Sequence, residues 1–159
     1  MSKNTCAAIE KLSESLQPSE PGQQTNALTA YLQGLATGLI ENASRKDDQG
    51  TDVNIVHSSY CAMIALVQHS CAQSMPVIQQ MLMPFLSMLE QTVSNPDVDS
   101  VRNTDTQDMI AGLLQVILVS VGNTVDTATG EKIVQLLVTM FQSLKKVTEN
   151  GLIAYSGLC

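Results

Sequence analysis

An apolar pattern of helical length recurs along this chain about every fifty residues, and each recurrence predicts two helices in succession. Apolar residues spaced three and four apart place one face of a helix against the protein core. In the first stretch, the leucines with this spacing are Leu28, Leu32, Leu35 and Leu39. The predicted pairs cover residues 27–44 with 54–71, and 76–93 with 105–121, and a third pair opens at Glu131.

Self-similarity at a period of about 40–47 residues, with two helices per unit, is typical of HEAT and armadillo repeats. We therefore predict an all-α fold, a HEAT-repeat (armadillo-like) α-solenoid of antiparallel helix pairs without β-sheet. Such repeats hold partners along an extended surface and seldom carry out chemistry. The predicted units are an inner helix of a truncated repeat at 4–16, HEAT repeats at 27–71 and 76–122, and a truncated repeat at 129–159.

Several residues mark the expected ends of these helices. Ser74 is expected to cap the fourth helix, and Pro84, inside that helix, to kink it. Asp105 or Thr106 is expected to start the fifth helix and Gly122 to end it. The helices at the two ends of the chain lack a neighbour, so we expect the sequence to be a fragment of a longer protein.

The charge and composition exclude several classes of function. The formal net charge is −7, from 15 acidic and 8 basic residues, which argues against a nucleic-acid partner and leaves a basic partner open. The most apolar run, 109–121, is shorter than the roughly 20 residues of a membrane-spanning helix and is expected to be a buried core helix. The polar start of the chain and four cysteines without metal or redox spacing favour a reducing intracellular compartment.

Two groups of neighbouring residues suggest chemistry that we do not expect. His57 and Cys61 are four residues apart on one helical face, but His69 lies too far along the helix to complete a metal site with them. Ser58 and Ser59 lie near His57, but nucleophilic catalysis also needs an acid that orients the histidine, and the sequence does not identify one. We therefore predict no catalytic residue, no metal and no cofactor.

Acidic and amide side chains near the starts of the second helices are the candidate binding residues. In a HEAT solenoid the second helix of each pair lines the concave face, where ligands bind. The candidate protein-binding residues are Glu10, Glu14, Asp105, Gln107, Asp108, Glu149 and Asn150. The alternative explanation is that acids near a helix N-terminus act as caps or interact with the helix dipole.

Several stretches resemble the importin-β (karyopherin-β) family of nuclear transport receptors, in the same order and at similar separations. These stretches are Asn4 to Ala7 with Leu12 to Glu14, Ser58 to Tyr60, Gln107 to Val121, Thr139 to Ser143, and Glu149 to Leu152. The resemblance implies central to C-terminal HEAT repeats of a nuclear import receptor. The family often has Trp after the cysteine of the first helix, where this chain has Ala7, which puts adaptor binding by that helix in doubt.

The resemblance also implies the partners. These are the basic importin-α adaptor segment or basic cargo, the Ran GTPase, and Phe-Gly nucleoporins that dock between outer helices. It implies a location in the cytoplasm, the nucleus and the nuclear pore. The alternative function is a HEAT-repeat scaffold of another assembly, such as another karyopherin or a phosphatase-type scaffold. We further expect self-association through the uncovered apolar stripes of the end helices, which include Leu12 and Leu152.

Overall fold

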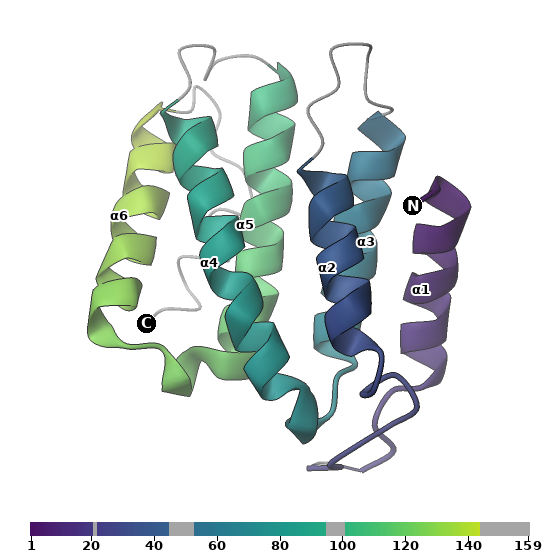
Figure 1. Cartoon of the computed structure of the whole chain (residues 1–159). Helices are drawn as coiled ribbons and strands as arrows, with labels where there is room; N and C mark the ends of the chain where they lie inside the picture. Colours follow the sequence, from purple (N-terminus) through teal and green to yellow (C-terminus); the bar gives the residue numbers. More distant parts are fainter. Residues whose placement is uncertain (21, 45–52, 95–100, 144–159) are drawn as a thin grey trace. The chain divides into compact units, whose positions relative to one another are not determined.

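The computed structural model of this chain describes residues 1–20, 22–44, 53–94 and 101–143. The described part consists of α-helices and short 3-10 turns and contains no strand, so the all-α prediction is confirmed (Figure 1). In chain order the elements are α1 (Lys3–Ser15), α2 (Leu32–Ala43), α3 (Val53–Gln68), η1 (Ala72–Ser74), α4 (Met75–Val93), α5 (Val101–Val121), η2 (Gly122–Thr124) and α6 (Thr127–Ser143). The expected seventh helix lies outside the described residues.

The chain divides into two compact units, Met1–Met81 and Leu82–Cys159. In the first unit α3 packs against both α1 and α2 (Figure 1). The buried side chains at this packing are mainly aliphatic, with Tyr60 as the aromatic member. Representative core residues are Cys6, Ile9, Leu32, Ala36, Leu39, Tyr60, Met63, Leu66 and Val67.

Asn26 ties together the ends of the helices in the first unit. Its side-chain amide donates hydrogen bonds to the carbonyl of Leu16 at the end of α1 (2.8 Å) and to that of His69 just after α3 (3.5 Å). Its side-chain oxygen accepts from the backbone N–H groups of Leu28 (3.0 Å) and Thr29 (3.1 Å). One amide therefore satisfies helix-terminal carbonyls and also shapes the turn before α2.

A second polar contact lies in the core of this unit. The buried Asn42 on α2 donates from Nδ2 to Oγ of Ser59 on α3 (2.6 Å), and Ser59 donates in turn to the Ile55 carbonyl (2.8 Å). The Cys6 thiol on α1 lies 3.6 Å from the same Ser59 oxygen. The three helices thus share a hydrogen-bonded centre, as a buried polar group requires.

In the second unit α4, α5 and α6 contribute the core. Their fully buried side chains include Phe85, Leu86, Leu89, Ile110, Leu113, Leu114, Ile117, Ile133, Leu137 and Met140. Helix α5 is buried on most of its circumference from Ile110 to Leu118, which agrees with the expected core helix. At the surface, Lys132 of α6 forms an ion pair with Glu90 of α4 at 2.9 Å.

Three helix starts differ by more than one residue from those expected. α2 begins at Leu32 rather than Ala27, because Asn26 holds residues 27–31 in turns. α5 begins at Val101 rather than Asp105 or Thr106, since residues 97–104 contain no Gly or Pro that would prevent the extension. α6 begins at Thr127 rather than Glu131, because Asp126 accepts a hydrogen bond from the Thr129 backbone N–H (3.0 Å) and caps the helix.

The buried face of α1 does not follow the apolar stripe of its sequence. The sequence pattern places Ile9, Leu12 and Leu16 on one stripe, but Leu12 is 47% exposed and Leu16 is half-buried. The buried residues of α1 are Cys6, Ile9 and Ser13. Ser13 enters this face because its hydroxyl is satisfied by the Ile9 carbonyl at 2.8 Å.

Candidate protein-binding surface

The α1 candidates Glu10 and Glu14 lie in different surroundings. Glu14 is exposed and forms an ion pair with Lys11 at 2.8 Å, and this hydrogen bond raises the pKa of Lys11. Glu10 is half-buried, and its charge acts on Cys61 of α3. Burial and then the Glu10 charge raise the pKa of the Cys61 thiol, which keeps the thiol protonated and poorly nucleophilic at neutral pH.

His57 and Cys61 lie side by side on α3, with Cys61 Sγ 3.6 Å from His57 Nδ1. No group of three or more His, Cys, Asp or Glu side chains among the described residues is arranged to hold a metal ion. Cys71, which follows α3, is buried. Within the described part of the chain, His57 and Cys61 therefore contact each other, and no third side chain joins them as a metal ligand.

The α5 candidates do not share one face. Asp105 is exposed, Asp108 is half-buried, and Gln107 is completely buried. Both polar atoms of the Gln107 amide and Oδ1 of Asp108 lack a hydrogen-bond partner within the described structure. The expectation that Gln107 lies at the ligand-binding surface thus needs correction, since its side chain belongs to the core.

The start of α5 at Val101 changes the interpretation of Asp105. A capping residue precedes the helix, and dipole effects fall off within the first turn. Asp105 lies in the second turn, and the first turn of α5 contains no acidic residue. Capping therefore does not explain this exposed carboxylate. Glu149 and Asn150, the remaining candidates, lie outside the described residues.

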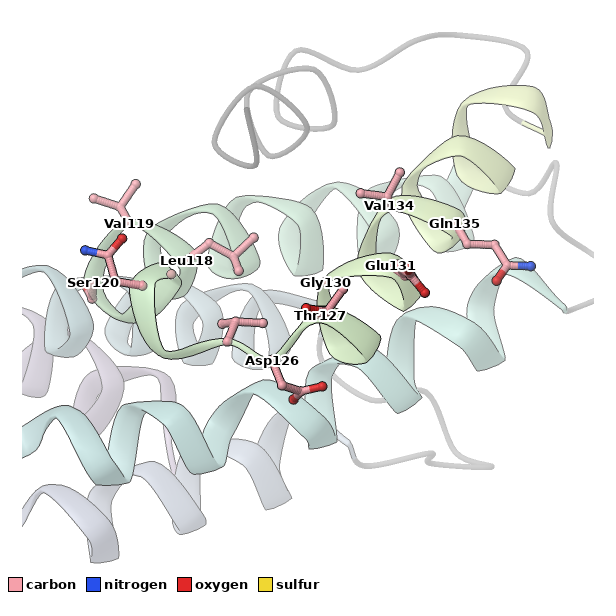
Figure 2. Close-up of a pocket in the computed structure, with 12 residues that line it drawn as sticks. Leu118, Val119, Ser120, Asp126, Thr127, Gly130, Glu131, Val134 and Gln135 are labelled. Carbon is pink, nitrogen blue, oxygen red and sulfur yellow. The ribbon is translucent and has the colours of Figure 1, made fainter.

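A hollow of about 840 Å³ lies where α5 turns into α6, and the sequence analysis did not identify it (Figure 2). Figure 2 shows Val119 of α5 and Val134 of α6 pointing to the same side, and Val119 is 71% exposed. The lining residues are Leu118, Val119, Ser120, Gly122, Asn123, Val125, Asp126, Thr127, Gly130, Glu131, Val134 and Gln135. They include two carboxylates and no lysine or arginine, so the hollow is acidic with an apolar side.

Asp126 combines a structural role with this position in the hollow. Its Oδ2 accepts from the Thr129 hydroxyl (2.7 Å) and its Oδ1 from the Thr129 backbone N–H (3.0 Å). These hydrogen bonds lower the pKa of Asp126, because they favour the charged carboxylate. In the sequence, Asp126 stands directly before α6, where a capping residue is expected. It was not recognised as the cap because the apolar pattern placed the start of this helix later, at Glu131.

Charge is unevenly distributed over the described side chains. Their lysines are Lys3, Lys11 and Lys132, and the last two are ion-paired with Glu14 and Glu90. The exposed carboxylates without an ion pair to a described side chain include those of Glu41, Asp105, Asp126 and Glu131. None of the described helices is long and apolar enough to cross a membrane.

Comparison with known proteins identifies the family. The profile of the family described as importin subunit beta-1-like, TPR repeats, matches residues 1–159. A crystal structure of importin beta in a polyethylene glycol condition superimposes with a TM-score of 0.79 at 21% sequence identity. The match covers 98% of this chain and 19% of that chain, so this chain spans about a fifth of importin beta. No curated protein matches the sequence significantly.

These matches confirm the predicted fold and resemblance. Importin beta is a HEAT-repeat solenoid, and its family is a transport-receptor scaffold rather than a class of enzymes. A match to the family profile over the whole sequence goes beyond shared architecture, because it rests on the residues themselves. The chain belongs to the importin subunit beta-1-like family of helical-repeat proteins.

Proposed function

We propose that this chain forms part of the ligand-binding surface of a nuclear import receptor and binds a Lys/Arg-rich segment of an adaptor or cargo protein. The second helices of the predicted pairs, α1, α3 and α5, provide the inner surface. The observation that carries the proposal is the excess of unpaired carboxylates over free lysines among the described side chains. A basic segment complements such a surface and is steered towards it.

Asp105 and Asp108 are the residues on which this binding depends most directly. They are three residues apart on α5, so their side chains are neighbours on the helix surface. Like charges at this spacing repel one another, and a bound lysine or arginine relieves that repulsion. Because Asp105 has no capping role, its removal tests ligand binding without disturbing the start of the helix.

The test is a titration of the chain with a basic adaptor peptide at two salt concentrations. An exposed ion pair contributes about 0–1 kcal/mol, so Asp105→Asn is expected to weaken binding by up to about fivefold. Raising the ionic strength from about 0.1 M to about 1 M shortens the Debye length from about 10 Å to about 3 Å and is expected to weaken binding further. Glu41→Gln, which removes an exposed carboxylate from the outer helix α2, is the charge-matched control.

Equal effects of Asp105→Asn and Glu41→Gln would show that net charge alone attracts the peptide. Binding that is insensitive to salt and to Asp105→Asn would contradict the proposal and leave these acids as solvated surface. The acidic hollow at the α5–α6 turn supplies a second contact for the same ligand through Glu131.

The other proposed partners are the Ran GTPase and Phe-Gly nucleoporins, with the protein moving between cytoplasm, nucleus and nuclear pore. Apolar side chains exposed on the outer helices, Met83 of α4 (52%) and Val138 of α6 (37%), support contacts with phenylalanine-bearing segments. Pull-down with the basic peptide, Ran and a Phe-Gly repeat tests these partners separately. Capture of none of them would favour the alternative, a helical-repeat scaffold of another assembly.

A further inference from the structure

The hollow at the α5–α6 turn lies within the second compact unit and has both an apolar and an acidic wall. Its volume is about 840 Å³. Val119 of α5 and Val134 of α6 point to the same side and form the apolar wall (Figure 2). Val119 is 71% exposed, so the chain itself leaves most of this apolar side chain uncovered.

The two carboxylates of the hollow differ in what they can still bind. Both oxygens of Asp126 accept hydrogen bonds from Thr129, at 3.0 Å and 2.7 Å, and hold the start of α6. Glu131 is exposed and forms no ion pair with a described side chain. Glu131 and Val134 are three residues apart on α6, so they are neighbours on the helix surface. The hollow therefore offers a free acid directly beside its apolar wall.

Two glycines leave room for the backbone of a bound chain at the same place. Gly130 lies inside α6, where glycine is destabilising relative to alanine. A Cβ added at Gly130 would meet no neighbouring atom within 4 Å, so packing within the chain does not require a glycine there. Gly122 of η2 lines the hollow with the same open space. Because neither position has a side chain, a ligand can approach the backbone closely at both.

We propose that this hollow binds a protein segment in which a lysine or arginine stands next to an apolar side chain. The inference rests on the proposed function and adds a selectivity that charge alone does not give. None of the described lining residues is a lysine or arginine, so a cationic group complements Glu131. The apolar side chain packs against Val119 and Val134, and the backbone of the segment passes over Gly130. Open space at a glycine is by itself insufficient, because Gly34 of α2 has it too, outside the hollow.

The experiment titrates the whole chain with two peptides of equal charge and follows binding by fluorescence anisotropy. The leucine peptide repeats the sequence Lys-Leu-Lys-Lys-Leu, and the serine peptide has serine in place of each leucine. Because burial of a leucine side chain is favourable, the serine peptide is expected to bind about tenfold more weakly. Equal affinities would overturn the inference and leave the charge-driven binding of the proposed function intact. Binding of neither peptide would overturn both.

A pair of glycine variants tests whether the leucine peptide lies in the hollow. Gly130→Ala places a methyl group where the backbone of the peptide passes, and this overpacking is expected to weaken binding by at least about fivefold. Gly34→Ala makes the same change in α2 and is expected to leave the affinity unchanged. Both variants replace a helical glycine with alanine in open space, so both are expected to raise the melting temperature by about 1–4 °C.

Glu131→Gln tests the acidic wall and is expected to weaken binding of the leucine peptide about threefold, whereas the control Glu41→Gln is expected to leave it unchanged. Unchanged affinity in Gly130→Ala or in Glu131→Gln, or an equal loss in Gly34→Ala, would overturn the inference. Asp105 does not line the hollow, so Asp105→Asn still tests the proposed function separately.

Discussion

The hydrogen-bonded centre of the first unit predicts a large difference between two adjacent serines on α3. Ser58 and Ser59 each donate to the carbonyl four residues earlier, at 2.6 Å and 2.8 Å. Only the buried Ser59 also accepts from Asn42 of α2 and contacts Cys6 of α1. Ser59→Ala therefore removes a group that three helices share, whereas Ser58→Ala makes the same chemical change without affecting a neighbouring helix.

The expected loss follows from what each substitution leaves behind. Asn42 is 1% exposed, so without the Ser59 oxygen its amide N–H loses its partner in the core. An unsatisfied buried donor costs about 1–3 kcal/mol, and Ser59→Ala is expected to lower the free energy of unfolding by that amount. For a chain of this size the melting temperature falls by roughly 2–12 °C. Ser58→Ala is expected to change stability by no more than about 0.5 kcal/mol.

Urea and thermal unfolding followed by far-UV circular dichroism measure both variants. A double-mutant cycle of Ser59→Ala with Asn42→Ala isolates the contact between them, and the two losses are expected to be less than additive. Equal losses for Ser58→Ala and Ser59→Ala, or strictly additive losses in the cycle, would refute the reasoning. In that case the buried contact between α2 and α3 would contribute nothing beyond packing.

Four further predictions concern single side chains. Glu10→Gln lowers the pKa of Cys61 by removing one of the two causes that raise it, and mass spectrometry after alkylation at a fixed pH should show faster labelling of Cys61. Asp126→Ala removes the cap of α6. Because the folded-state pKa of Asp126 is lowered, its contribution to stability is present at neutral pH and is lost as the pH falls through that pKa. The urea midpoints of the variant and the unchanged chain should therefore differ at neutral pH and converge in acid. Gln107→Leu removes a buried amide without a described partner and should leave the urea midpoint unchanged or raise it. The chain should self-associate at high concentration in light scattering, and Leu12→Lys should reduce this association.

The sequence was sufficient to predict the helices because their apolar faces are long and regular. It was less informative about where helices begin, since a start depends on a few local hydrogen bonds. At α2 the side chain of Asn26 holds the preceding residues in turns, and at α6 the carboxylate of Asp126 starts the helix earlier than its apolar pattern does. At α5 the helix extends to Val101 through polar residues that carry no apolar signal.

Packing between helices was the other feature that the sequence alone did not predict. Whether Leu12 of α1 is covered depends on the neighbour that reaches it, and the stripe alone does not identify that neighbour. The hollow at the α5–α6 turn has the same origin, because residues from two helices and η2 form it together. The position of Pro84 inside the fourth helix, by contrast, was predictable from the sequence alone.

The geometry of α5 decides which of its candidates act together. Successive residues of an α-helix are about 100° apart around the axis, so Asp105 and Asp108 lie within about 60° of one another. Gln107 is about 160° from Asp105 and shares its stripe with Ile110, Ala111 and Leu114, all of which are buried. Sequence position near the helix start grouped the three residues, but the helical face separates them. On the proposed function, a ligand that approaches α5 from solvent meets the exposed Asp105 first and the half-buried Asp108, whose Oδ1 is covered, beside it, whereas the Gln107 amide is out of reach.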